Sequence, residues 1–284
     1  MNFRKNNCSP TILHVVMGMS EHEWKNVRTG LADALQCDPF SVFLVGTDSP
    51  SVSDVLPNGQ WDMVCFAVGG ESTATEQMLR LSKLAKESGA LSIIAAKCKS
   101  WNAAEALAEY ALSQEKILAH ADSLILFPDE TASEQNFYTQ VGEFLSQIKR
   151  FMDRDGPIIL DFDDISSVLK DAGIAYVANQ VIKVDSLENQ THNYNQFVPQ
   201  SGFATVKNYL LSIVGCTDIE LANIEATTSA VRQQLASNAD FSFGLLLDPT
   251  LKSEMRITVL LSGIDPSIVN IPGENMVWNS KISV

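Results

Sequence analysis

Short apolar runs alternate with amphipathic stretches through the first half of the chain. Five runs have the length and the continuous apolar character of strands buried on both faces: residues 11–17, 41–45, 61–68, 91–96 and 123–127. Helical spacing separates them in three places: residues 21–35, 73–88 and 102–119. Strands of this kind, joined by helices, predict a parallel sheet built from right-handed βαβ units under two helical layers.

The pattern changes after a long amphipathic helix that is predicted for about residues 132–152. Beyond it, strands and helices mix, with strands expected at residues 157–160, 174–182, 209–214, 241–246 and 256–261 and helices at 163–173 and 221–236. We therefore expect an α/β domain at residues 1–155, which includes the long central helix. A smaller α+β domain with a short tail is expected at residues 156–284.

The composition is that of a folded protein that avoids polyanions. Hydrophobic residues make up 45% of the 284 positions and charged residues 19%, which excludes a disordered chain. The 20 basic residues are outnumbered by 34 acidic ones, and the net charge is −14. Because this charge repels phosphate backbones and anionic lipids, we expect no nucleic-acid partner.

Cysteine usage and the apolar runs indicate where the protein works. The five cysteines are odd in number and show no CxxC spacing, and Cys65 and Cys98 lie in apolar runs. They are expected to be buried free thiols of a reducing compartment. No run approaches 18 apolar residues, and the four histidines share no ligand spacing. We expect a cytoplasmic protein with no direct membrane insertion and no metal site.

Three blocks of the sequence carry a family resemblance. They are residues 61–130 (from WDMVCFAVGG to HADSLILFPDE), 156–176 (GPIILDFDDISSVLKDAGIAY) and 235–264 (LASNADFSFGLLLDPTLKSEMRITVLLSGI). Their order and spacing resemble the FtsZ/tubulin family of self-assembling GTPases. The resemblance implies a Rossmann-like GTPase domain with a parallel sheet, a long central helix and a smaller α+β C-terminal domain.

The resemblance also implies which residues belong to a nucleotide site. The glycine-rich signature turn of the family corresponds to residues 69–75, where two glycines remain and a hydroxyl can still cap a helix that accepts an anion. The vestigial nucleotide-binding residues implied in this way are Gly69, Gly70, Ser72, Thr73 and Asp129.

Departures from the family pattern predict that this site is degenerate. The first glycine-rich turn is missing, because VVMG is followed by MSEHEW. Glu71 stands inside the signature turn, and a carboxylate about 4 Å from one phosphate charge costs about 4 kcal/mol at an effective dielectric of 20. Other polar positions of the family pocket correspond to Asn102, Ala106, Tyr138, Thr139 and Ile159. We expect no bound cofactor, with GTP or GDP and Mg²⁺ as the alternative.

An acidic segment follows the central helix. By resemblance, Asp161 and Asp164 are the catalytic carboxylates that polarise water in the nucleotide site of the next subunit. The alternative is an N-cap, in which Asp161 or Asp163 satisfies the first turn of a helix. The two interpretations are compatible.

The function expected from the sequence is that of an FtsZ-like cytoskeletal or cell-division-related protein. We expect it to bind and hydrolyse GTP inefficiently, and therefore favour a role other than that of an enzyme. Its partners are then itself or an FtsZ-type protein. One alternative is an active, divergent GTPase that forms filaments. The other is an unrelated α/β enzyme that binds a small ligand at the carboxyl ends of its strands, near Gly69 and Gly70.

Overall fold

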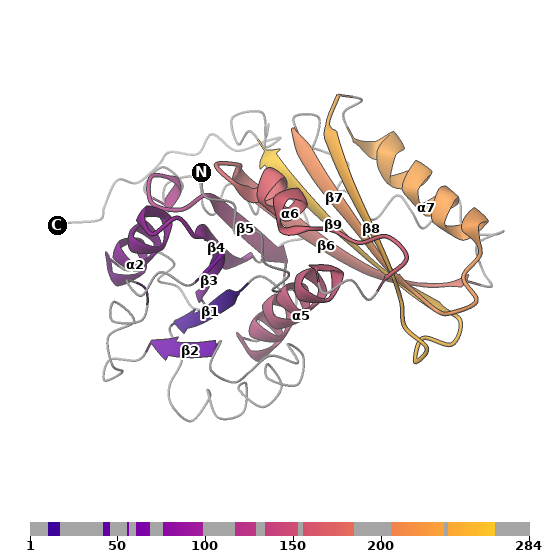
Figure 1. Ribbon diagram of the computed structural model, residues 1–284, viewed down its shortest axis with the longest axis horizontal. Helices are drawn as coiled ribbons and strands as arrows, with labels where there is room; N and C mark the ends of the chain where they lie inside the picture. Colours follow the sequence, from indigo (N-terminus) through magenta and orange to yellow (C-terminus); the bar gives the residue numbers. More distant parts are fainter. Residues whose placement is uncertain are drawn as a thin grey trace, which may run out of the picture.

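The computed structural model describes a mixed α/β protein built on one sheet (Figure 1). The described residues are 11–17, 42–45, 56, 61–68, 76–98, 117–128, 134–152, 156–184, 206–235 and 238–264. Within them, nine strands follow the order β2-β1-β3-β4-β5-β6-β9-β7-β8.

The first six strands run parallel, five of them as the apolar runs predict and the sixth from the segment expected to belong to the α+β half. They are β1 (Ile12–Met17), β2 (Val42–Val45), β3 (Met63–Val68), β4 (Leu91–Cys98), β5 (Ser123–Pro128) and β6 (Gly173–Lys183). Helix α2 (Glu76–Glu87) joins β3 to β4 and ends before Gly89, whose φ of 90° suits a glycine beyond a helix end. The helix predicted for residues 21–35 lies outside the described residues. So does most of the helix predicted for residues 102–119, of which the structure describes only residues 117–119.

The predicted central helix is α5 (Glu134–Met152), and its apolar stripe is buried. It packs on one face of the sheet, where its aromatic side chains join the strand residues of one core cluster. A second cluster fills the opposite face. Figure 1 shows α5 beside the place where the parallel strands give way to the second half of the sheet.

The second half is mixed, as expected for an α+β segment. It contains α6 (Phe162–Leu169), β7 (Asn208–Gly215), α7 (Leu221–Gln234), β8 (Asp240–Leu247) and β9 (Glu254–Ile264). Strand β9 lies between β6 and β7 and is antiparallel to both, whereas β7 and β8 are parallel. The sheet continues without a break from β5 to β6, so a division into two domains at residue 155 stays a prediction.

The strand predicted for residues 157–160 is wrong. Ile158 forms only one isolated bridge, to Leu245 of β8, and the side chains of Ile158 and Ile159 are 40% and 42% exposed. The chain then turns inward at Leu160, whose side chain packs where a Cβ on Gly244 would lie. The segment therefore crosses the edge of β8 instead of extending the sheet.

Two titratable side chains lie inside the core as neutral groups. Cys65 is a buried free thiol, as predicted, and burial raises its pKa to about 12. His14 faces it in the register of β1 and β3, and burial lowers the pKa of His14 to about 4. A neutral thiol beside a neutral imidazole is not an activated nucleophile. None of the described helices is both long and apolar enough to traverse a bilayer.

Candidate functional site

The topology indicates where a ligand would bind in a sheet of this kind. In the order β2-β1-β3-β4-β5, β2 is added on one side of β1, and β3 and the later strands are added on the other side. Sheets with this topology bind ligands beyond the carboxyl ends of the strands at the switch point, which here lies between β1 and β3. Here these ends are Met17 and Val68, which are both buried. The predicted phosphate-binding residues that follow β3 and β5 lie outside the described residues: Gly69, Gly70, Ser72, Thr73 and Asp129.

A tyrosine from α5 closes the carboxyl end of β1. The hydroxyl of Tyr138 donates a hydrogen bond of 2.7 Å to the carbonyl oxygen of Met17, and the side chain is 0% exposed. The ring of Phe137 lies 5.0 Å from that of Tyr138, and its edge also meets Phe127 of β5. The described residues here are therefore an apolar aromatic cluster and a carbonyl that is already bonded.

The two predicted catalytic carboxylates lie together at the start of α6. Asp161 is the N-cap residue, and its Oδ1 accepts a hydrogen bond of 2.8 Å from the backbone N–H of Asp164. In return, Oδ2 of Asp164 accepts a bond of 2.9 Å from the N–H of Asp161. This reciprocal capping box confirms the N-cap interpretation for Asp161. The catalytic role of the two residues stays a prediction.

We call residues 156–164 the acidic loop, and the edge of β8 holds its first part. The N–H of Ile158 donates to the carbonyl of Leu245 at 3.3 Å, and the N–H of Leu245 donates to Ile158 at 2.9 Å. Gly156 passes so close that a Cβ there would overlap the Leu245 carbonyl oxygen. With both ends bonded, the loop presents its exposed isoleucines and the exposed carboxylates of Asp161 and Asp163 from a fixed base.

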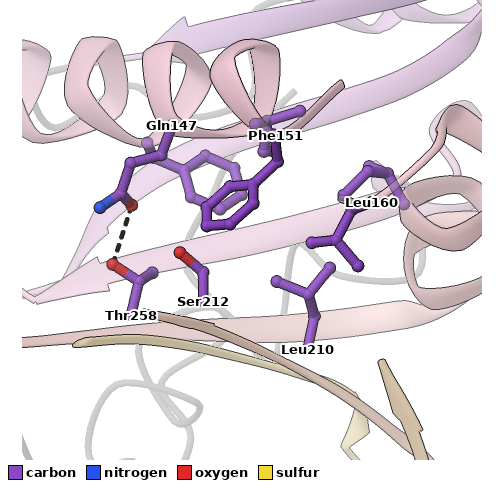
Figure 2. A pocket seen from close by; sticks show the side chains of 9 residues that line it. Gln147, Phe151, Leu160, Leu210, Ser212 and Thr258 are labelled. Carbon is purple, nitrogen blue, oxygen red and sulfur yellow. Dashed lines mark hydrogen bonds between the residues drawn. The ribbon is translucent and has the colours of Figure 1, made fainter. Parts of the chain in front are cut away.

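A cavity between α5 and the second half of the sheet lies behind the acidic loop (Figure 2). Leu160 of the loop forms part of its wall, facing Phe151 and Leu210. At its polar end the Thr258 hydroxyl lies 2.9 Å from Gln147 Oε1, and Ser212 lies beside it. The lining holds no titratable side chain. The lining residues therefore offer hydroxyl and amide groups for hydrogen bonding, but no acid or base.

Sequence reasoning names Tyr138 only as a changed pocket position and misses its contact with Met17. It also misses the bridge between Ile158 and Leu245, which joins segments far apart in the chain. Within the described ranges, no three His, Cys, Asp or Glu side chains gather as a metal site.

Removal of the N-cap side chain is expected to weaken α6. Asp161→Ala loses the bond to the Asp164 N–H, and we expect about 1 kcal/mol less free energy of unfolding. Urea denaturation followed by circular dichroism measures the loss. Asp163→Ala is the matched control, since it removes an equal charge from the first turn but no capping bond. Equal losses in the two variants would contradict the assigned cap.

Comparison with known proteins finds similarity to FtsZ. The model of the FtsZ family C-terminal domain matches residues 200–265, which hold β7, α7, β8 and β9. The cell division protein FtsZ of Wigglesworthia glossinidia brevipalpis is 24% identical over 220 residues, which cover 72% of this chain. They cover 57% of that relative, so the chain spans just over half of its length.

Solved structures agree over nearly the whole chain. An empty FtsZ dimer from M. jannaschii matches with a TM-score of 0.65 at 17% identity, covering 90% of this chain and 89% of that one. CetZ2 from Haloferax volcanii, solved as a GTPγS-bound protofilament, matches with a TM-score of 0.59 at 15% identity and covers 89% and 93%. The C-terminal domain match, the curated relative and the shared fold together support the resemblance of this chain to the FtsZ/tubulin family.

Proposed function

We propose that this protein works by association, with itself or with an FtsZ-type filament, and does not bind or hydrolyse GTP efficiently. The observation that carries the proposal is Tyr138, whose side chain is buried at the carboxyl end of β1 and bonded to Met17. Relatives support the association: one solved structure is an FtsZ dimer and another is a protofilament.

The position of Tyr138 makes nucleotide binding costly. Truncation of a buried aromatic side chain costs about 3 kcal/mol or more, and a ligand that had to expel this ring would meet a similar cost. That amounts to roughly a hundredfold or more in affinity.

The acidic loop is the surface that we propose for association. It combines the two exposed isoleucines with the carboxylates of Asp161 and Asp163 on a base held by β8. A head-to-tail filament needs two complementary faces on every subunit. A subunit that offers the acidic loop but lacks a nucleotide on its opposite face docks at one end only. It is then expected to cap or modulate a partner's filament instead of extending it.

A second candidate is an active, divergent GTPase with GTP or GDP and Mg²⁺. The retained Asp161 and Asp164 favour it, since they stand where the family has its catalytic carboxylates. The similarity to FtsZ over 72% of this chain disfavours the unrelated small-ligand enzyme.

Calorimetry and co-sedimentation test the proposal. We expect GTP with Mg²⁺ to bind more weakly than roughly 1 mM. We also expect the protein alone to form no long filaments, but to pellet with FtsZ filaments assembled with GTP. The double variant Ile158→Ser/Ile159→Ser is expected to stay in the supernatant, since both side chains are exposed and their loss leaves the core intact. Micromolar GTP binding, or long filaments of the protein alone, would favour the GTPase.

A further inference from the structure

One ammonium group joins α2 to the turn that follows α6. Lys86, in the last turn of α2, places Nζ 2.6 Å from Asp171 Oδ1 and 3.2 Å from Asp122 Oδ1. The same Nζ donates to the carbonyl oxygen of Ala121 at 3.3 Å. Asp122 and Asp171 are 36 and 85 residues further along the chain.

Asp122 requires this cation because it is buried. Its side chain is 3% exposed, and Oδ2 accepts a hydrogen bond of 2.8 Å from the N–H of Ser92. The other oxygen, Oδ1, has no hydrogen-bond partner among the described residues and is contacted there by the ammonium of Lys86. The backbone carbonyl of Asp122 also accepts from the N–H of Gly173 at 3.2 Å. Lys86 is thereby fixed to the amino ends of β4, β5 and β6.

Helix ends explain why a cation is favoured at this position. Lys86 lies in the C-terminal turn of α2, Ala121 follows the helical turn at residues 117–118, and Asp171 follows α6. The C-terminal end of each helix carries partial negative charge, so one ammonium interacts favourably with three of them. Burial would lower the pKa of Lys86, but the hydrogen bond to Asp171 and the negative charge of Asp122 raise it overall. The bond from Lys86 holds the pKa of Asp171 below its usual value.

The contact lies at the opposite end of α6 from the acidic loop. Serine hydroxyls cap the last carbonyls of α6: Ser262 donates to Val168 at 2.6 Å, and Ser123 donates to Leu169. Asp171 follows in the left-handed conformation, with a φ of 49°. An eight-residue helix is about 12 Å long and acts as a rigid piece. The position of its C-terminal end therefore sets the direction of its N-terminal end.

We propose that Lys86 is a positioning residue for the acidic loop. Its ammonium fixes the C-terminal end of α6 against α2, and so sets the orientation in which the acidic loop meets a partner. This inference rests on the proposed function of the acidic loop and adds the residue that controls it.

Hydrogen exchange tests the first part of the proposal without any partner. Asp171→Asn is the main variant, because it removes the negative charge that holds the turn after α6 to Lys86 but keeps the Lys86–Asp122 pair. We expect the α6 amides to exchange about five- to tenfold faster, with the amides of β4 unchanged. Lys86→Met is expected to show the same change, and Lys86→Arg to restore slow exchange. Lys83→Met is the control, since among the described residues Lys83 forms an ion pair at the surface with Glu87 of the same helix.

Co-sedimentation with FtsZ filaments tests the second part. We expect Asp171→Asn to weaken docking by a similar factor, whereas Ile93→Val, which destabilises the core of β4, leaves docking unchanged. Unchanged α6 exchange in Asp171→Asn would overturn the proposal, as would faster exchange with unchanged docking. If the wild-type protein does not dock, the proposed function fails, and the exchange experiment alone decides whether Lys86 fixes α6.

Discussion

Acidification from pH 7 to pH 4 is expected to remove about 3 kcal/mol of unfolding free energy through one residue, His14. The imidazole is 1% exposed, and neither ring nitrogen has a hydrogen-bond partner among the described residues. Burial lowers its pKa from 6.5 to about 4. A charge at this place would be surrounded by apolar side chains on the α5 face of the sheet.

The direction of the effect follows from proton binding in the two states. Above pH 6.5 the imidazole is neutral in the folded and in the unfolded chain, and stability does not depend on it. Between pH 6.5 and pH 4 the unfolded chain takes up the proton and the folded chain does not. The stability supplied by a neutral His14 is therefore present at neutral pH and lost as the pH falls through this window.

His14→Leu isolates the contribution. The variant keeps the side-chain bulk and removes the two unpartnered nitrogens, so we expect equal or greater stability at pH 7. Urea denaturation at several pH values between 7 and 4 gives the difference in unfolding free energy between the two proteins. The contribution of the carboxylates is the same in both and cancels in this difference. If wild type and variant lose stability in parallel, His14 is not the acid-sensitive group.

Gly156→Ala is expected to cost about 2 kcal/mol or more of unfolding free energy. The added methyl group would overlap the carbonyl oxygen of Leu245 and lie 2.5 Å from Cδ2 of Leu246. One of these neighbours is backbone, so relief requires the acidic loop to move away from β8. We expect both hydrogen bonds between Ile158 and Leu245 to break, with faster amide exchange at Leu245.

Gly89→Ala serves as the comparison for that variant. A Cβ on Gly89 meets nothing within 4 Å, but the φ of 90° penalises any side chain. We expect a loss of about 1 kcal/mol from the backbone alone, with no change in exchange at Leu245. Equal losses with protected Leu245 amides in both variants would show that the loop does not depend on close packing at Gly156.

The strands of the parallel half were predictable because each lies in a continuous apolar run. The run at residues 61–68 contains β3 (Met63–Val68), and the run at residues 91–96 lies within β4 (Leu91–Cys98). The run at residues 157–160 has a similar composition but is only four residues long, and periodicity cannot classify so short a segment. Its structure depends on the edge of β8, which lies more than eighty residues further along the chain.

Separation along the chain explains which site contacts were predictable. The N-cap at Asp161 bonds to a group three residues away, so the local sequence contains both partners. Tyr138 bonds to a carbonyl 121 residues away, and Lys86 to a carboxylate 85 residues away. In both cases the local sequence contains the donor but not its acceptor, because only the packing of α5 and α2 on the sheet brings the two together.

The place of β9 in the sheet affects how the nascent chain folds during synthesis. The last described strand to leave the ribosome pairs with β6 on one side and β7 on the other. Until residue 264 has emerged, both neighbours expose unpaired edges, whereas the parallel strands β1 to β5 can already assemble. Translation that stalls before β9 therefore releases a chain with two open edges, a favourable substrate for chaperones and for aggregation.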